Sequence, residues 1–124
     1  MTLVKSFLRS LRHAFAGIVY AFREERNFQI ELVLGLAALG LTFFFPLSPA
    51  ERSIIFLLIG FILTLELVNT AFERLLDLLK PRVHPYVKVV KDVVAGAVLI
   101  GSVAALLVGA FIFLPYLMTW AMYQ

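Results

Sequence analysis

Three apolar stretches, each long enough to cross a lipid bilayer as a helix, leave this chain few possible folds. They cover approximately residues 28–45, 53–79 and 93–114. A helix needs about 20 mostly apolar residues to cross a hydrocarbon core that is about 30 Å thick. Because 62% of the residues are hydrophobic and only 15% are charged, the sequence predicts an all-α integral membrane protein with a single domain over residues 1–124. Prolines follow the three stretches, at Pro46, Pro81 and Pro115, where we expect the spans to end.

Residues 1–24 have a different pattern, in which apolar and charged side chains separate onto two sides of a helical wheel. The apolar side carries Leu3, Val4, Phe7, Leu8, Leu11, Phe15, Ile18, Val19 and Phe22. The polar side carries Lys5, Arg9, Arg12, His13 and Arg23. This separation is typical of an amphipathic helix that lies on a membrane surface. The sequence therefore predicts a surface helix followed by three transmembrane helices.

The basic residues predict how the chain is oriented in the membrane. All of its Lys and Arg residues except Arg52 either precede the first span or lie around the connection between the second and third spans. Basic residues accumulate on the cytoplasmic side of membrane proteins. We therefore expect the N-terminus in the cytoplasm and the C-terminus outside.

A polar stripe interrupts the second apolar stretch. Glu66, Asn69, Glu73 and Asp77 follow one another at helical spacing. At about 100° per residue, the four positions fall within a narrow arc of one helix face. An ionisable residue inside a membrane indicates a functional site. The alternative is that the stripe only holds helices together, as intramembrane polar groups also do.

The depth of this stripe indicates its chemistry. Glu66 lies about 20 Å from the outer end of its span, at about 1.5 Å per residue, and other acids are expected near the same inner level. These are Glu24, Glu25, Glu31 and Asp92. Clustered carboxylates repel one another unless cations neutralise them, and Mg²⁺ prefers oxygen ligands. A site reachable by a cytosolic nucleotide and by a lipid headgroup favours phosphoryl transfer to a lipid alcohol. Glu31 would also suit a contact with the lipid headgroup.

The usual nucleotide-binding loops are absent from the sequence. Neither G-x-x-x-x-G-K-[ST] nor G-x-G-x-x-G occurs, which excludes the P-loop and the protein-kinase way of binding phosphates. There is no Cys, so a thiolate metal site is excluded as well.

The segment E-L-V-N-T-A-F-E-R-L-L-D over residues 66–77, followed by K-D at 91–92, resembles the motif of the small prokaryotic diacylglycerol kinase family, which includes undecaprenol kinases. The resemblance covers nearly the whole chain. It implies a homotrimeric helical bundle in the bacterial cell membrane, with active sites shared between neighbouring subunits. It also implies ATP as co-substrate, Mg²⁺ as cofactor, a lipid alcohol as acceptor and no nucleic-acid partner.

The resemblance also implies roles for individual residues. Glu66 resembles the catalytic base of the family, and Asn69 resembles the polar residue beside that base. Glu25 and Glu73 resemble the metal-coordinating carboxylates that contact ATP through magnesium.

Four further residues match the nucleotide-binding positions of the family. Lys91 and Asp92 match a nucleotide-binding pair, and Arg82 with His84 matches the connection that covers the nucleotide. Three of them have a simpler alternative. Lys91 could extend its charged end to the membrane surface with Asp92 as its partner, and His84 suits an ordinary turn.

The chain departs from the family pattern on its surface helix. Ser6 and His13 stand where the best-studied diacylglycerol kinase has an Arg and a Tyr near the nucleotide, although Arg9 lies one turn away. The stretches E-R-N-F at 25–28 and V-G-A-F-I-F-L-P at 108–115 look more like the undecaprenol kinase branch. We therefore expect undecaprenol as the acceptor, with diacylglycerol as the alternative.

Small residues recur every four positions along the third span. They are Ala97, Gly101, Ala105 and Gly109. This spacing lets helices approach closely, so we expect it to serve assembly.

A small proton-coupled exporter is an alternative from another class. Its single membrane carboxylate would be Glu66, alternating between a proton and a cationic substrate. Many transporters show internal duplication, which this sequence lacks, and an exporter does not need the additional acids. Substitution of Glu73 or Asp92 should separate the two, because only a kinase needs magnesium and ATP.

Overall fold

The computed structural model describes residues 2–79 and 85–124, which form four α-helices and no strand. The helices are α1 (Leu3–Glu24), α2 (Arg26–Phe44), α3 (Pro49–Asp77) and α4 (Pro85–Met122). By length and composition, α2, α3 and α4 can each cross a membrane. The prediction of an all-α chain with three helices long and apolar enough to cross a membrane is therefore confirmed.

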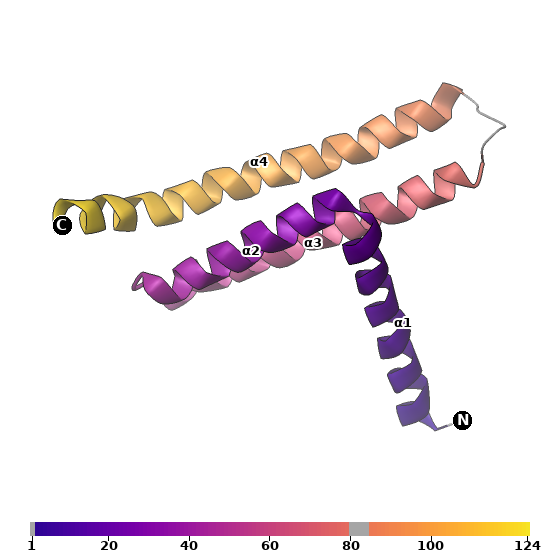
Figure 1. The fold of residues 1–124 in the computed structure, drawn as a ribbon, viewed down its shortest axis with the longest axis horizontal. Helices are drawn as coiled ribbons and strands as arrows, with labels where there is room; N and C mark the ends of the chain where they lie inside the picture. The colour runs from indigo at the N-terminus through magenta and orange to yellow at the C-terminus, as the bar shows by residue number, and fades with distance from the viewer. Residues whose placement is uncertain (1, 80–84) are drawn as a thin grey trace.

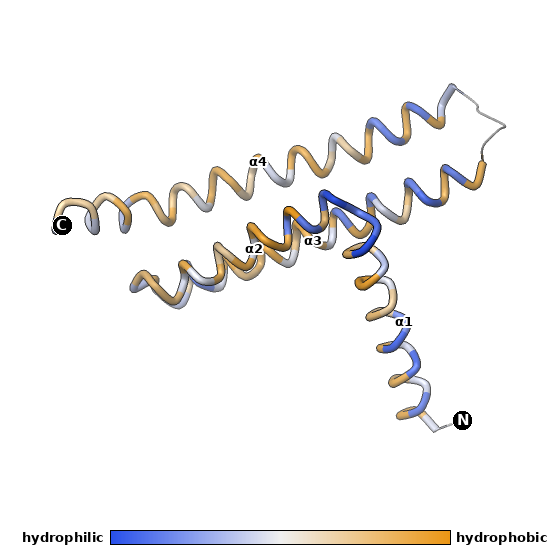
Figure 2. Tube along the Cα trace, viewed as in Figure 1, coloured by the Kyte–Doolittle hydropathy of each residue, from blue (hydrophilic) through white to orange (hydrophobic). Residues whose placement is uncertain are grey.

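Helix α3 is the centre of the bundle. It packs against α2 on one side and α4 on the other. Helix α1 contacts α2 and α3 near the elbow between α1 and α2, and then projects steeply away from the bundle (Figure 1). Hydrophilic residues concentrate at this elbow and at the neighbouring ends of α3 and α4 (Figure 2). We call this the acidic end of the bundle, and the end with the α2–α3 connection the aromatic end.

The aromatic end holds most of the packed core. Its buried residues are Phe45, Leu47, Ile55, Ile112 and Phe113. The ring of Phe45 lies 6.4 Å from that of Phe113 and 6.1 Å from that of Tyr116. These contacts join the α2–α3 connection to α4, since the last two rings belong to that helix.

A capping box starts α3 at the aromatic end. The backbone N–H of Ser48 donates to the Glu51 carboxylate at 2.8 Å, and the backbone N–H of Glu51 donates to the Ser48 hydroxyl at 3.2 Å. Such a box satisfies N–H groups that a helix start leaves without partners. The Tyr116 hydroxyl of α4 donates to the same Glu51 oxygen at 2.8 Å. This carboxylate therefore caps α3 and ties it to α4.

Helix α4 is longer than the span expected from the sequence. It begins at Pro85, before residue 93 where we expected the span to start, and it continues through Pro115 to Met122. Proline suits the first turn of a helix because no N–H is needed there. Within a membrane helix, a proline is tolerated where neighbouring groups satisfy the freed backbone. Pro115 therefore does not end the helix.

Only part of the small-residue pattern on α4 serves packing within the chain. A Cβ added at Gly101 would lie 2.6 Å from Cδ1 of Leu65 on α3, whereas a Cβ at Gly109 would meet no atom within 4 Å. Gly101 thus permits the close approach of α3 and α4. Gly109 remains open on the groove side of α4.

Candidate functional site

The centre of the candidate site is a buried carboxylate on α3. The side chain of Glu66 is only 1% exposed, and that of Asn69, one turn further, is 8% exposed. The side-chain amide of Asn69 donates a hydrogen bond to the Glu66 carboxylate. Burial of a charged group is costly without compensation, and one hydrogen bond offsets only part of the cost of burying the Glu66 carboxylate.

Three further carboxylates approach Glu66 from separate parts of the chain. Glu25 and Glu73 interact with it electrostatically, and so does Glu31 of α2. Glu25 stands at the elbow itself, where the backbone is extended between the two helices. The fold therefore brings together acids from the elbow, α2 and α3.

One ion pair offsets part of this negative charge. Arg74 Nη2 on α3 lies 2.5 Å from Oε1 of Glu25. Its guanidinium carbon also lies 5.6 Å from the ring centre of Tyr20 on α1. For Glu31, Glu66 and Glu73, the described ranges 2–79 and 85–124 contain no ion pair. The cluster therefore carries a negative charge that an additional cation can neutralise.

A second ion pair lies at the acidic end of α3. Lys91 Nζ on α4 lies 2.9 Å from Oδ1 of Asp77. The sequence suggested Asp92 as a simple partner of Lys91, but neighbouring residues on a helix point in different directions, and Asp92 is exposed. Lys91 thus reaches the polar stripe, whereas Asp92 is on the surface of this single chain.

The two other predicted nucleotide contacts, Arg82 and His84, lie outside the described residues. The surface-helix positions that depart from the family pattern are described. Ser6 and His13 are exposed side chains on α1.

The carboxylates are compatible with magnesium but do not enclose it by themselves. Within residues 2–79 and 85–124, there is no group of three or more Asp, Glu, His or Cys side chains that could hold a metal ion. Magnesium usually takes one or two protein carboxylates and completes its shell with phosphate oxygens and waters. Glu25 and Glu73 match this donor chemistry, and the surplus negative charge around Glu66 favours a cation there.

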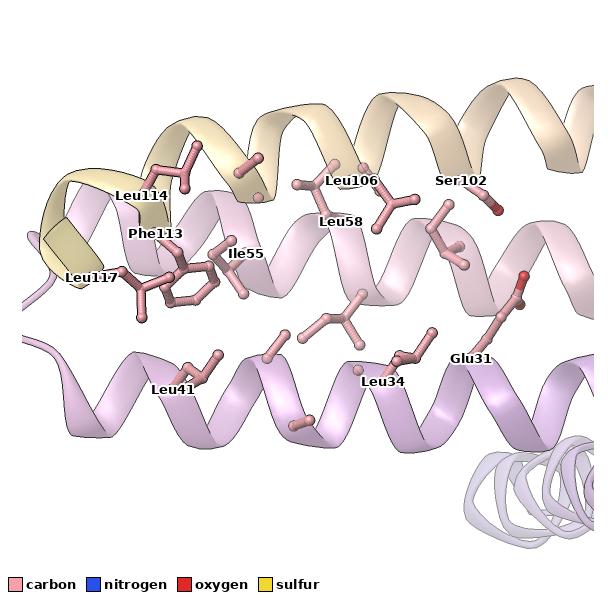
Figure 3. Close-up of a pocket in the computed structure, with 18 residues that line it drawn as sticks. Glu31, Leu34, Leu41, Ile55, Leu58, Ser102, Leu106, Phe113, Leu114 and Leu117 are labelled. Carbon is pink, nitrogen blue, oxygen red and sulfur yellow. The ribbon is translucent and has the colours of Figure 1, made fainter. Parts of the chain in front are cut away.

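An apolar groove joins this cluster. A cavity of about 600 Å³ lies between α2 and α4, with α3 as its floor (Figure 3). Glu31 points into the groove near its acidic end, opposite Ser102 of α4. The Oε2 atom of Glu31 is buried and has no hydrogen-bond partner within the part of the chain that the structure describes. The rest of the lining is almost entirely apolar, including Leu34, Leu58, Leu106, Phe113 and Leu117.

Sequence reasoning missed two side chains that shape the site. Arg74 was counted only as one of the basic residues near a connection, and Tyr20 was not singled out. Their contacts depend on the angle of the elbow, which hydropathy does not encode. The sequence did contain one signal for Arg74, because a basic residue directly after Glu73 in an acidic motif can pair with a nearby carboxylate.

Known proteins that are similar to this chain include undecaprenol kinase and diacylglycerol kinases. Residues 12–113 match the family model described as prokaryotic diacylglycerol kinase. The chain is 45% identical over 111 residues to the undecaprenol kinase of Bacillus subtilis, covering 90% of each chain. It is 36% identical over 115 residues to the diacylglycerol kinase of Synechocystis, covering 92% of this chain and 66% of that protein. It is also 29% identical over 115 residues to the diacylglycerol kinase of Helicobacter pylori, covering 93% and 87% of the two chains.

Proposed function

Because this chain belongs to the prokaryotic diacylglycerol kinase family, a family of lipid kinases, we propose that it transfers the γ-phosphate of ATP to undecaprenol, giving undecaprenyl phosphate. The observation that carries this proposal is the junction of two environments. A carboxylate cluster around the buried Glu66 lies beside an apolar groove that runs along α2 and α4. A kinase for a lipid alcohol needs both, because its acceptor has a polar reactive end and a hydrocarbon chain.

Glu66 acts as the general base in this proposal. The acceptor hydroxyl loses its proton to the Glu66 carboxylate as its oxygen bonds to the γ-phosphorus of ATP, and ADP leaves. Asn69 donates a hydrogen bond to Glu66 and so holds the carboxylate in place. Burial keeps bulk water away from the carboxylate and so disfavours ATP hydrolysis.

Glu25 and Glu73 hold Mg²⁺ in this proposal. The ion, when bound with ATP, supplies charge neutralisation for the phosphates. Both carboxylates lie within electrostatic reach of Glu66, so the metal-binding and proton-accepting groups belong to one cluster. The two carboxylates set the position of the nucleotide relative to the acceptor.

The remaining nucleotide contacts are assigned to the cytoplasmic side. The ion pair with Asp77 holds the Lys91 ammonium beside the polar stripe. A positive charge in this place favours an interaction with ATP phosphates. We assign Asp92, Arg82 and His84 to the nucleotide on the family pattern. The exposure of Asp92 is compatible with a site that two neighbouring subunits complete.

A homotrimer with composite sites is part of the proposal. Many large apolar residues of α3 and α4 are exposed in the single chain, and lipid or another subunit must cover them. Ala97, one of the regularly spaced small residues of α4, is exposed and so is available for packing between subunits. Small residues at this spacing support close helix association in membranes.

The hydrocarbon chain of the acceptor occupies the groove. Its lining is apolar along α2 and α4, and Glu31 supplies a hydrogen-bond acceptor at the end nearest Glu66. The choice of undecaprenol rests on the similarity to the Bacillus protein. Diacylglycerol is the second candidate, because the Synechocystis and Helicobacter relatives carry that name.

Helix α1 lies on the cytoplasmic surface of the membrane in this proposal. Its apolar side chains are exposed, including Phe7 at 64% and Phe15 at 68%. Its basic residues suit anionic headgroups. This orientation places the elbow and the nucleotide site on the cytoplasmic side.

The test is ATP-dependent phosphate transfer by the purified protein in detergent with magnesium. Undecaprenol and diacylglycerol are offered separately and then in competition. We expect faster transfer to undecaprenol. Faster transfer to diacylglycerol would move the assignment to the second candidate, and transfer to neither lipid would contradict the proposal and favour the exporter.

A further inference from the structure

Arg74 connects three parts of the molecule at the candidate site. The residue itself is on α3, directly after Glu73. Its guanidinium pairs with Glu25 at the elbow, with an N–O distance of 2.5 Å, and lies 5.6 Å from the ring centre of Tyr20 on α1. One side chain therefore contacts both the last turns of α1 and the carboxylate assigned to the metal.

The elbow has few other means of fixing the direction of Glu25. Its backbone is extended, with φ −113° and ψ 110°, and its N–H donates to the carbonyl of Ala21 at 2.9 Å. Within a helix, side chains three or four positions apart contact one another. Glu25 lies between two helices and has fewer such contacts to orient its side chain. Arg74 supplies the ion-pair contact that holds the Glu25 side chain.

The geometry leaves Glu25 able to serve a second partner. Arg74 bonds to Oε1, and a carboxylate can accept several bonds through its two oxygens. Oε2 thus stays available to a cation while Oε1 is held. An Arg guanidinium suits this task because it stays charged and also stacks on aromatic rings.

We propose that Arg74 is a positioning residue, which fixes the angle of α1 through Tyr20 and directs Glu25 toward Mg²⁺-ATP. The assignment of Glu25 to the metal rests on the proposed function, whereas the hold on α1 does not. A stabilising role alone is a poor alternative, because the Arg74 side chain is 45% exposed and exposed ion pairs contribute little to stability.

Steady-state kinetics of Arg74→Gln test the positioning of Glu25. We expect the KM for Mg²⁺-ATP to rise about tenfold, the scale of losing one hydrogen bond to a charged group, with kcat and the KM for undecaprenol changed much less. Arg74→Lys should recover part of the loss, because it restores the charge without the planar fork. The matched control is Arg23→Gln, which removes a positive charge from exposed Arg23 near the same elbow and should leave all three constants unchanged.

The Tyr20 contact is tested with two substitutions. Tyr20→Phe keeps the ring and should behave as the wild type. Tyr20→Leu removes the ring and should raise the KM for Mg²⁺-ATP in the same direction as Arg74→Gln, to a smaller extent.

A distance measurement tests the hold on α1 independently of activity. The chain has no Cys, so spin labels can be placed at Ser10→Cys on α1 and Leu78→Cys after α3, both exposed sites. Labelled chains are diluted with unlabelled protein, and pulsed electron paramagnetic resonance gives the distance distribution without nucleotide. We expect a narrow distribution in the otherwise wild-type protein, a broad one with Arg74→Gln, and an unchanged one with Arg23→Gln.

The outcomes separate this inference from the proposed function. An unchanged distance distribution in Arg74→Gln would overturn the inference, and so would an unchanged KM for Mg²⁺-ATP in an active enzyme. If the wild-type protein phosphorylates no lipid, the proposed function fails, and the distance distribution alone then decides the role of Arg74.

Discussion

Helix α3 carries a glutamate in each of two contrasting regions. At the aromatic end, Glu51 accepts hydrogen bonds from the Ser48 backbone and the Tyr116 hydroxyl. In the middle of the helix, Glu66 is 1% exposed and receives a hydrogen bond from Asn69. Three other carboxylates, those of Glu25, Glu31 and Glu73, interact with it electrostatically. The Glu51 carboxylate has hydrogen-bond donors around it, whereas the Glu66 carboxylate is surrounded by other carboxylates.

This contrast separates the region that holds the helices together from the region to which we assign the chemistry. The region around Glu51 is packed with aromatic rings and joins α3 to α4. The region around Glu66 has surplus negative charge, which is unfavourable inside a membrane. A chain that keeps such a cluster gains from binding a cation there, as the proposed kinase mechanism requires.

The largest expected effect follows from removing the base. Glu66→Gln should lower kcat for undecaprenol phosphorylation by about 10²–10⁴-fold, the usual contribution of a positioned general base. The melting temperature in detergent should stay the same or rise, because the amide removes a charge from the cluster. A variant that keeps wild-type kcat would show that Glu66 does not accept the proton.

The next effect concerns magnesium. Glu73→Gln should raise the Mg²⁺ concentration needed for half-maximal activity about tenfold or more, because a metal-binding carboxylate typically contributes at least this factor. A magnesium titration at fixed ATP measures it. Glu24→Gln is the control, since Glu24 is an exposed acid beside the elbow, and an equal shift in both variants would contradict a specific role for Glu73.

A third effect concerns the groove. Ala105 lines the groove on α4, so Ala105→Phe should obstruct the hydrocarbon chain and raise the KM for undecaprenol about tenfold, with the KM for Mg²⁺-ATP unchanged. Ala104→Phe places the same ring at the adjacent exposed position and is the matched control. Equal effects from the two substitutions would argue against an acceptor chain in this groove.

The smallest effect on activity should come from the aromatic end. Tyr116→Phe removes the hydrogen bond between α4 and Glu51 while keeping the ring. The melting temperature should fall by a few degrees, and both KM values should stay unchanged. A thermal melt and steady-state kinetics on one preparation measure this, and a large change in KM would mean that the two regions are coupled.

Much of the fold could be predicted because hydropathy is local. The three apolar stretches determine three long helices, and the spacing of Glu66, Asn69 and Glu73 places them on one face. The ends of α4 were predicted less well, because proline breaks a helix only where its missing N–H and its ring cannot be accommodated. Pro85 and Pro115 both lie where the helix accommodates them.

The candidate site was predictable where it follows a helix face and unpredictable where it depends on tertiary contacts. The pairs Arg74–Glu25 and Lys91–Asp77 join different elements, and their partners depend on the elbow angle and on how α4 packs along α3. The groove likewise arises from the separation of α2 and α4. The periodicity of apolar residues in the sequence does not predict these distances between helices.

The most direct test of the contrast between the two glutamates is one phosphate-transfer assay on three proteins. Wild type, Glu66→Gln and Glu51→Gln are compared for transfer of labelled γ-phosphate from ATP to undecaprenol in the presence of Mg²⁺. We expect wild type and Glu51→Gln to form labelled undecaprenyl phosphate at similar rates and Glu66→Gln to form almost none. Similar rates in the two variants would contradict the assignment of the carboxylate cluster around Glu66 as the catalytic site.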